Sequence, residues 1–128
     1  MTLEYEKIRR EESEGLAAWL ASDTWPFFLD SAPTEAEIHQ RLAAGDFFGA
    51  GEENFWIRDA DGDLIGLIEI YQLDDLAPMF SLRLKTRYRR LGLGKPGLGW
   101  LTDYIFKNYP DKRRIEGQTR EDNIPMRK

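Results

Sequence analysis

The alternation of hydrophobic and polar positions predicts a central set of β-strands. Residues 54–58, 64–71 and 79–84 are short runs rich in aromatic and β-branched side chains, and polar turn residues separate them. Asp61-Gly62, between the first two runs, is typical of a tight hairpin turn. Residues 2–9 predict one further strand. Because strands joined by short connections usually lie side by side, we expect an antiparallel meander.

Helical spacing of apolar residues occurs in three other segments. Ser13 is expected to cap a short helix, while Thr34 and Glu37 fit a capping box that opens a second one. A third helix follows residues 92–94, and residues 114–119 predict a final strand parallel to the strand before that helix. The expected fold class is α+β (α/β): one twisted, mostly antiparallel sheet flanked by helices. Its order is strand, two helices, three strands, helix and strand.

Charge is unevenly distributed along the chain. The 128 residues, enough for a single domain at 1–128, have a net charge of −5. Residues 1–81 hold 18 acidic and 5 basic side chains, whereas residues 82–95 hold 6 basic side chains and no acidic one. The net acidity argues against binding nucleic acid through the whole surface. The positive charge is concentrated in one short segment.

Several classes of site lack the residues they need. The sequence contains no cysteine, which excludes a disulfide, a thiolate metal site and a cysteine nucleophile. With a single histidine, the sequence has too few ligands for a typical zinc site, so we expect no metal. The single histidine and the lack of a G-x-S-x-G motif also argue against a Ser-His-Asp triad. We find no signal-peptide pattern and no apolar run long enough to cross a bilayer. We therefore expect a cytoplasmic protein without a membrane partner.

The basic segment coincides with a glycine-containing turn between a strand and a helix. Backbone N–H groups, the positive end of a helix dipole and the small size of glycine together favour an anion site there. Gly92-x-Gly94-x-x-Gly97 fits the dinucleotide fingerprint, but that turn should follow the first strand of its fold. A Walker A loop is excluded because no Gly-Lys-Ser/Thr stands at the required spacing.

The sequence from Tyr88 to Gly94 resembles the Q/R-x-x-G-x-G/A motif of the GNAT superfamily of N-acetyltransferases, with Arg89 in the first position. The flanking strands and helix match the family order, and Asn123 is similar to the family's Asn just beyond the next strand. Residues 113–123 look most like the branch that acetylates ribosomal-protein N-termini. The resemblance covers residues 3–128 in element order, but its specific motif spans only about seven residues.

The resemblance implies acetyl transfer from acetyl-CoA to a primary amine, either a small amine or a peptide N-terminus, by direct attack. It implies that backbone amides of the turn hold the pyrophosphate and that residues 82–84 pair with pantetheine like an added strand. The cofactor-binding residues expected on this basis are Leu82, Arg83, Leu84, Arg89, Arg90, Leu91, Gly92, Leu93, Gly94, Lys95 and Asn123.

Three residues are candidates for removing the amine proton or positioning a water: Glu69, Ser81 and Glu116. Related sequences often carry a glutamate on the strand before the turn, where the nearest positions here are Met79 and Ser81. For each candidate, the ordinary alternative is a solvent-facing strand residue with no catalytic role. The sequence leaves the choice among the three open.

The family normally continues past the Asn with a helix, which often carries a proton-donating tyrosine, and a β-hairpin. The chain ends five residues after Asn123, so we expect a C-terminal truncation; the alternatives are a partner chain that supplies the missing wall of the acceptor site and a degenerate protein. Residues 114–119 would then form an exposed edge strand, a surface on which a homodimer could assemble, as it could through the C-terminal region. The alternative function is a non-catalytic acyl-CoA-binding or interaction module derived from the same fold.

Overall fold

A computed structural model describes residues 3–23, 32–45, 47–88, 93–112, 114–119 and 126–127. The helices and strands, in chain order, are β1 (Glu4–Lys7), α1 (Ser13–Ala21), α2 (Glu35–Ala43), β2 (Glu53–Arg58), β3 (Leu64–Tyr71), β4 (Met79–Leu84), α3 (Gly94–Asn108), β5 (Arg114–Thr119) and β6 (Met126–Arg127). Short 3-10 turns precede α1 at Arg10–Glu12 and follow β4 at Thr86–Tyr88. The predicted order of elements is confirmed as far as β5.

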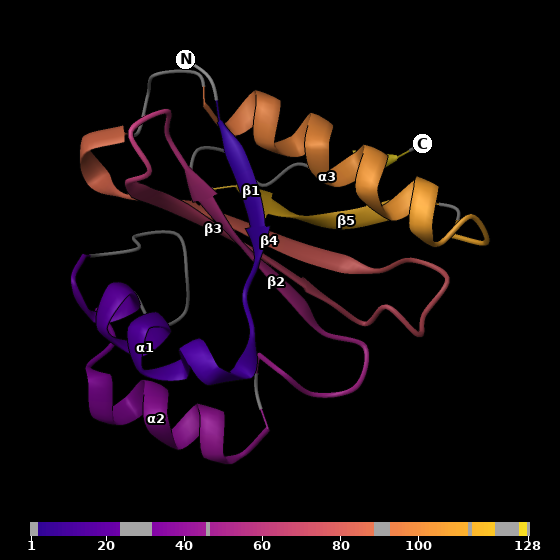
Figure 1. Cartoon of the computed structure of the whole chain (residues 1–128). Coiled ribbons are helices and arrows are strands. Elements are labelled where there is room, and N and C mark those ends of the chain that lie inside the picture. Colours follow the sequence, from indigo (N-terminus) through magenta and orange to yellow (C-terminus); the bar gives the residue numbers. More distant parts are fainter. Residues whose placement is uncertain are drawn as a thin grey trace.

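The strands form one sheet in the order β1-β2-β3-β4-β5-β6 (Figure 1). Strands β1 to β4 are antiparallel neighbours, as the meander predicts, and β5 joins β4 in parallel across α3. Gly62 adopts a positive φ of 87° in the β2–β3 turn, which confirms the turn predicted at Asp61-Gly62. The carboxylate of Asp59 closes this turn by accepting from the backbone N–H groups of Asp61 and Asp63, both at 3.0 Å.

Helices cover both faces of the sheet. Figure 1 shows α3 on one side and α1 with α2 on the other. Alternating residues of the strands therefore enter two different cores. The core under α3 includes Phe80, Leu82 and Leu101, whereas the core under α1 and α2 is built around Trp56 and Leu67.

The capping box of α2 is confirmed, but the predicted cap of α1 is wrong. The Thr34 hydroxyl accepts from the Glu37 backbone N–H at 3.2 Å. In α1 the N-cap residue is Glu12, and Ser13 is already helical, with its Oγ donating to the Arg10 carbonyl. Glu12 makes no side-chain cap because its carboxylate is engaged with residues outside α1.

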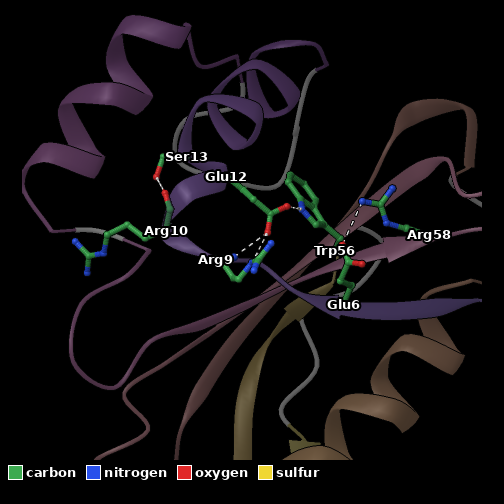
Figure 2. A network of polar contacts seen from close by, with 7 residues as sticks. All are labelled: Glu6, Arg9, Arg10, Glu12, Ser13, Trp56 and Arg58. Atoms are coloured by element: carbon green, nitrogen blue, oxygen red, sulfur yellow. Dashed lines mark hydrogen bonds and ion pairs between the residues drawn. The ribbon is translucent and has the colours of Figure 1, made fainter.

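The Glu12 carboxylate fastens the β1–α1 corner to the sheet, as Figure 2 shows. One oxygen accepts from the indole N–H of buried Trp56 at 3.3 Å, and the other accepts from the Arg9 backbone N–H at 3.0 Å. Nearby, an ion pair of 3.2 Å joins Arg58 of β2 to Glu6 of β1. These contacts fix the start of α1 relative to β2, and so they hold α1 on its face of the sheet.

The sequence predicts that β5 is an open edge of the sheet, but the structure places a further strand, β6, beside it. Strand β6 pairs with β5 in antiparallel register, with Arg114 opposite Arg127 and Ile115 opposite Met126. The prediction of an exposed edge is therefore wrong for the first two residues of β5. None of the helices in the described part of the chain has both the length and the apolar character needed to cross a bilayer.

A carboxylate and two tyrosines join the C-terminal half of α3 to β2. The hydroxyls of Tyr104 and Tyr109 each donate to an oxygen of Glu53, and the Lys7 ammonium lies 3.4 Å from the same carboxylate. Trp100 stacks on Tyr104 with ring centroids 5.3 Å apart. This cluster anchors the helix whose N-terminus follows the glycine turn.

The Glu53 cluster predicts a pH dependence of stability. Burial by itself raises the pKa of Glu53, but hydrogen bonds from Tyr104 and Tyr109 and the charge of Lys7 outweigh it and hold the pKa below its ordinary value of 4.5. A lowered folded-state pKa stabilises above the unfolded value, and this contribution is lost as pH falls through the folded pKa. The free energy of unfolding should therefore fall as pH drops below about 4.5.

Glu53→Gln should make that fall shallower and cost about 1–2 kcal/mol at neutral pH, because hydrogen bonds to a charged acceptor become bonds to a neutral one. Urea unfolding across a pH series measures both effects. Glu11→Gln, at an exposed position of the turn before α1, is the control and should keep the slope of the unmodified protein. Equal slopes for the Glu53 variant and the unmodified protein would contradict the assignment.

Candidate functional site

The predicted anion site lies where β4 leads into α3. Residues 89–92 of this connection lie outside the described residues, and the chain is described again from Leu93, the N-cap of α3. Leu93 makes no side-chain cap, and the first turn of α3 carries no acidic residue. The N-terminal amides of this 15-residue helix therefore remain uncapped by the N-cap side chain, and their positive dipole end is not neutralised by a carboxylate in that turn.

The first turn of α3 packs directly on β4. A Cβ built on Gly97 would lie 2.8 Å from Leu82 Cδ1, too close for a normal contact, so glycine lets the helix approach the strand here. A Cβ on Gly99 would meet nothing within 4 Å. The third glycine of the Gly92-x-Gly94-x-x-Gly97 pattern thus serves close helix–strand packing, and Gly99 has no such role.

Strand β4 continues for two residues beyond its described pairing with β5. The parallel register joins residues 79–82 to residues 116–119, and Leu82 is opposite Thr119. Arg83 and Leu84 follow this paired stretch, and they are the last two residues of β4 before the connection that contains the glycine turn. Residues 82–84, predicted to bind pantetheine, therefore start where the described β4–β5 pairing ends.

Three polar residues form a row across the face of the sheet that carries α1 and α2. Asn54 of β2 is opposite Glu69 of β3, which is opposite Ser81 of β4. The structure therefore brings together two of the three candidate catalytic residues. The third, Glu116, is described only through its backbone, which pairs with Met79, two positions before Ser81 along β4.

Glu69 forms an ion pair with the side chain of Arg83. From the sequence, a role is predicted only for the backbone of Arg83, in binding pantetheine. Arg83 Nε donates to Glu69 Oε1 at 3.2 Å, and the two side chains are 7% and 13% exposed. The guanidinium and the carboxylate thus form an ion pair that is nearly buried. The period-two alternation of strands places residues 81 and 83 on one face, but the pairing with Glu69 depends on the β3–β4 register.

Ser81 and Tyr71 complete the polar surface around this ion pair. Ser81 is 5% exposed, and its hydroxyl has no hydrogen-bond partner among the described residues. Tyr71, two positions beyond Glu69, is half-buried; burial and the charge of Glu69 raise its pKa, and the charge of Arg83 opposes them. Sequence reasoning missed Tyr71, although its spacing from Glu69 already placed both side chains on one face.

The basic residues of the 82–95 segment divide between two locations. Lys85 Nζ donates to Ser22 Oγ at 2.8 Å and lies 5.6 Å from the Trp19 ring, so it joins β4 to the end of α1. Arg83 also faces this side. Lys95 is exposed in the first turn of α3, and Arg87 lies over the Tyr88 ring. Arg83 and Lys85, two of the clustered basic residues, therefore make contacts within the fold.

Four cofactor-binding predictions on the turn, at Arg89, Arg90, Leu91 and Gly92, and the prediction at Asn123 lie outside the described residues. Gly94 is described as the first residue of α3, and Leu93 is buried in the core under that helix. The described start of α3 thus fits an anionic substrate group, because its N-terminus has no side-chain cap and its first turn holds no acidic residue.

Comparison with known proteins identifies relatives of this architecture. The sequence model of the acetyltransferase (GNAT) family matches residues 16–128. A chimera of spermidine N-acetyltransferase SpeG from Vibrio cholerae and hSSAT has a TM-score of 0.68 at 16% identity, covering 91% of this chain and 70% of that one. A domain from Methanocaldococcus jannaschii has a TM-score of 0.68 at 12% identity, covering 91% and 76%.

A further similar structure is the Vibrio cholerae spermidine N-acetyltransferase in complex with CoA and spermine. Its TM-score is 0.67 at 17% identity, with 90% of this chain and 69% of that one covered. No curated protein matches the sequence. The comparisons confirm the resemblance at the level of the family, and they do not point specifically to the branch that acetylates ribosomal-protein N-termini.

Proposed function

The chain belongs to the acetyltransferase (GNAT) family, and from this premise we propose that it transfers an acetyl group from acetyl-CoA to a primary amine. One observation carries the proposal: the uncapped N-terminus of α3 is packed tightly on β4 through Gly97, directly after the glycine turn. A diphosphate at that turn would meet backbone N–H groups and the positive end of a helix.

The same arrangement supports the way acetyl-CoA would be held. Gly94 and Lys95 at the start of α3, with the turn residues before them, would bind the pyrophosphate. Backbone groups of residues 82–84 would bind the pantetheine arm along β4, next to the stretch that pairs with β5. Arg89, Arg90, Leu91, Gly92 and Asn123 remain predicted contributors to this site.

The acceptor would approach the face that carries the polar row. An amine must be neutral to attack a thioester carbonyl, so a group on this face or a water has to receive a proton. Glu69, Ser81 and Glu116 are the candidates, and the structure places the first two opposite each other. The acidic first 81 residues suit a cationic amine, and the similar structure with spermine makes polyamines sensible members of an acceptor panel.

Thiol release from acetyl-CoA tests the proposal. The purified protein is incubated with acetyl-CoA and one amine at a time, drawn from spermidine, spermine and N-terminal peptides. We expect thiol release above the amine-free rate for at least one amine, with a matching acetylated product in the mass spectrum. Binding of acetyl-CoA without transfer to any amine would instead support the alternative, a non-catalytic acyl-CoA-binding module.

A further inference from the structure

Among the described residues, the nearly buried hydroxyl of Ser81 has no hydrogen-bond partner. Ser81 is 5% exposed, and no described residue donates a hydrogen bond to Ser81 Oγ or accepts one from it. A buried hydroxyl without a partner is destabilising, and most buried polar groups in folded proteins are hydrogen-bonded. Within the described residues, the Ser81 hydroxyl therefore keeps its donor and acceptor sites available to a bound molecule.

The other polar members of the row are already engaged. The Asn54 amide donates to the Phe47 carbonyl, and Glu69 Oε1 accepts from Arg83 Nε at 3.2 Å. Glu69 is therefore held in an ion pair with Arg83, and both side chains are nearly buried. Of these three side chains, Ser81 is the one that makes no hydrogen bond to any described residue.

The position of Ser81 suits contact with the reacting atoms. It directly precedes residues 82–84, the backbone proposed to bind pantetheine. Leu82 and Leu84 are buried in the core under α3, whereas Ser81 shares its face with Glu69, on the side proposed for the acceptor. The hydroxyl therefore lies on the acceptor side of the strand along which the thioester would be held.

We propose that Ser81 is a catalytic residue that passes a proton from the attacking amine to the leaving sulfur; this inference rests on the proposed acetyl transfer. The amine nitrogen forms a bond to the acetyl carbonyl carbon, and the carbon–sulfur bond breaks with its electron pair remaining on sulfur. Ser81 Oγ accepts the proton that the nitrogen loses and gives its own hydroxyl proton to the sulfur. The products are the acetylated amine and the free thiol, and Ser81 is regenerated.

Ser81→Ala, Ser81→Thr and the control Ser13→Ala test this role. Loss of one general acid–base group lowers turnover by roughly 100-fold or more, so we expect kcat of Ser81→Ala to fall about 100-fold. Acetyl-CoA affinity by calorimetry should change by less than about threefold, since the backbone contacts persist. Ser81→Thr keeps the hydroxyl and should remain within about tenfold of the unmodified kcat. Ser13→Ala removes the same atom on α1 and should leave kcat unchanged.

Thermal stability separates catalysis from structure. Because Ser81→Ala removes an unsatisfied buried hydroxyl, its melting temperature should equal or exceed that of the unmodified protein. A lower melting temperature together with lost acetyl-CoA binding would show a structural role and overturn the proposal. Unchanged kcat in Ser81→Ala would overturn the shuttle alone. Acetyl-CoA binding without transfer to any amine by the unmodified protein would overturn the shuttle and the proposed function together.

Discussion

Gly94→Glu is expected to weaken acetyl-CoA binding by about 100-fold, or about 2.7 kcal/mol. Gly94 is the first residue of α3, and neither the N-cap side chain nor an acid in the first turn neutralises that end of the helix. A carboxylate there would place negative charge and bulk where the pyrophosphate is proposed to bind. It would also occupy the N–H groups and the dipole end that favour an anion.

Gly99→Glu is the matched control for this variant. It introduces the same side chain on the same helix, at an exposed position where a Cβ would meet nothing within 4 Å. We expect its acetyl-CoA affinity to stay within about threefold of the unmodified value, since the dipole effect fades beyond the first turn. Calorimetry measures both affinities, and circular dichroism checks the helix content. Unchanged affinity in Gly94→Glu would refute the placement of the pyrophosphate.

The strands could be predicted because their signals are local. Alternating apolar residues, the Asp61-Gly62 turn and the Thr34–Glu37 capping box act within a few residues of one another, and each is present as expected. The failure at Ser13 has a long-range cause. Glu12 turns its carboxylate toward Trp56, 44 positions away, so the helix begins one residue earlier than the cap pattern indicates.

Some features of the candidate site depend on residues close together in sequence, and others depend on how distant strands pair. The glycine turn within the basic segment could be recognised in the sequence, whereas the close packing of Gly97 on Leu82 is seen only in the structure. The Arg83–Glu69 ion pair could not be predicted, because it depends on the register that sets Glu69 opposite Ser81. If the β3–β4 register shifted by one residue, Glu69 and Arg83 would lie on opposite faces of the sheet and could not pair. A cluster of basic residues in sequence therefore does not reveal which of them face a ligand.

The Arg83–Glu69 pair predicts the largest stability effect at the site. Removing one partner of a buried ion pair leaves an uncompensated charge and costs roughly 3–5 kcal/mol. Because the Glu69 side chain keeps 13% exposure, we expect Arg83→Met to lose about 3 kcal/mol of unfolding free energy. Urea unfolding followed by tryptophan fluorescence measures this loss. Arg58→Met is the control, since its ion pair with Glu6 is much more exposed, and it should cost about 1 kcal/mol or less.

A double-mutant cycle shows whether the loss belongs to the pair. Glu69→Gln removes the charge that Arg83→Met leaves buried, so the double variant should be more stable than the sum of the single effects predicts, by at least about 1 kcal/mol. Additive effects within about 0.5 kcal/mol would mean that the two side chains do not stabilise each other. Coupling, by contrast, would establish that Glu69 is committed to Arg83 in the folded protein. A carboxylate committed in this way would hold β3 and β4 together through their side chains, as a structural group beneath the proposed acceptor site.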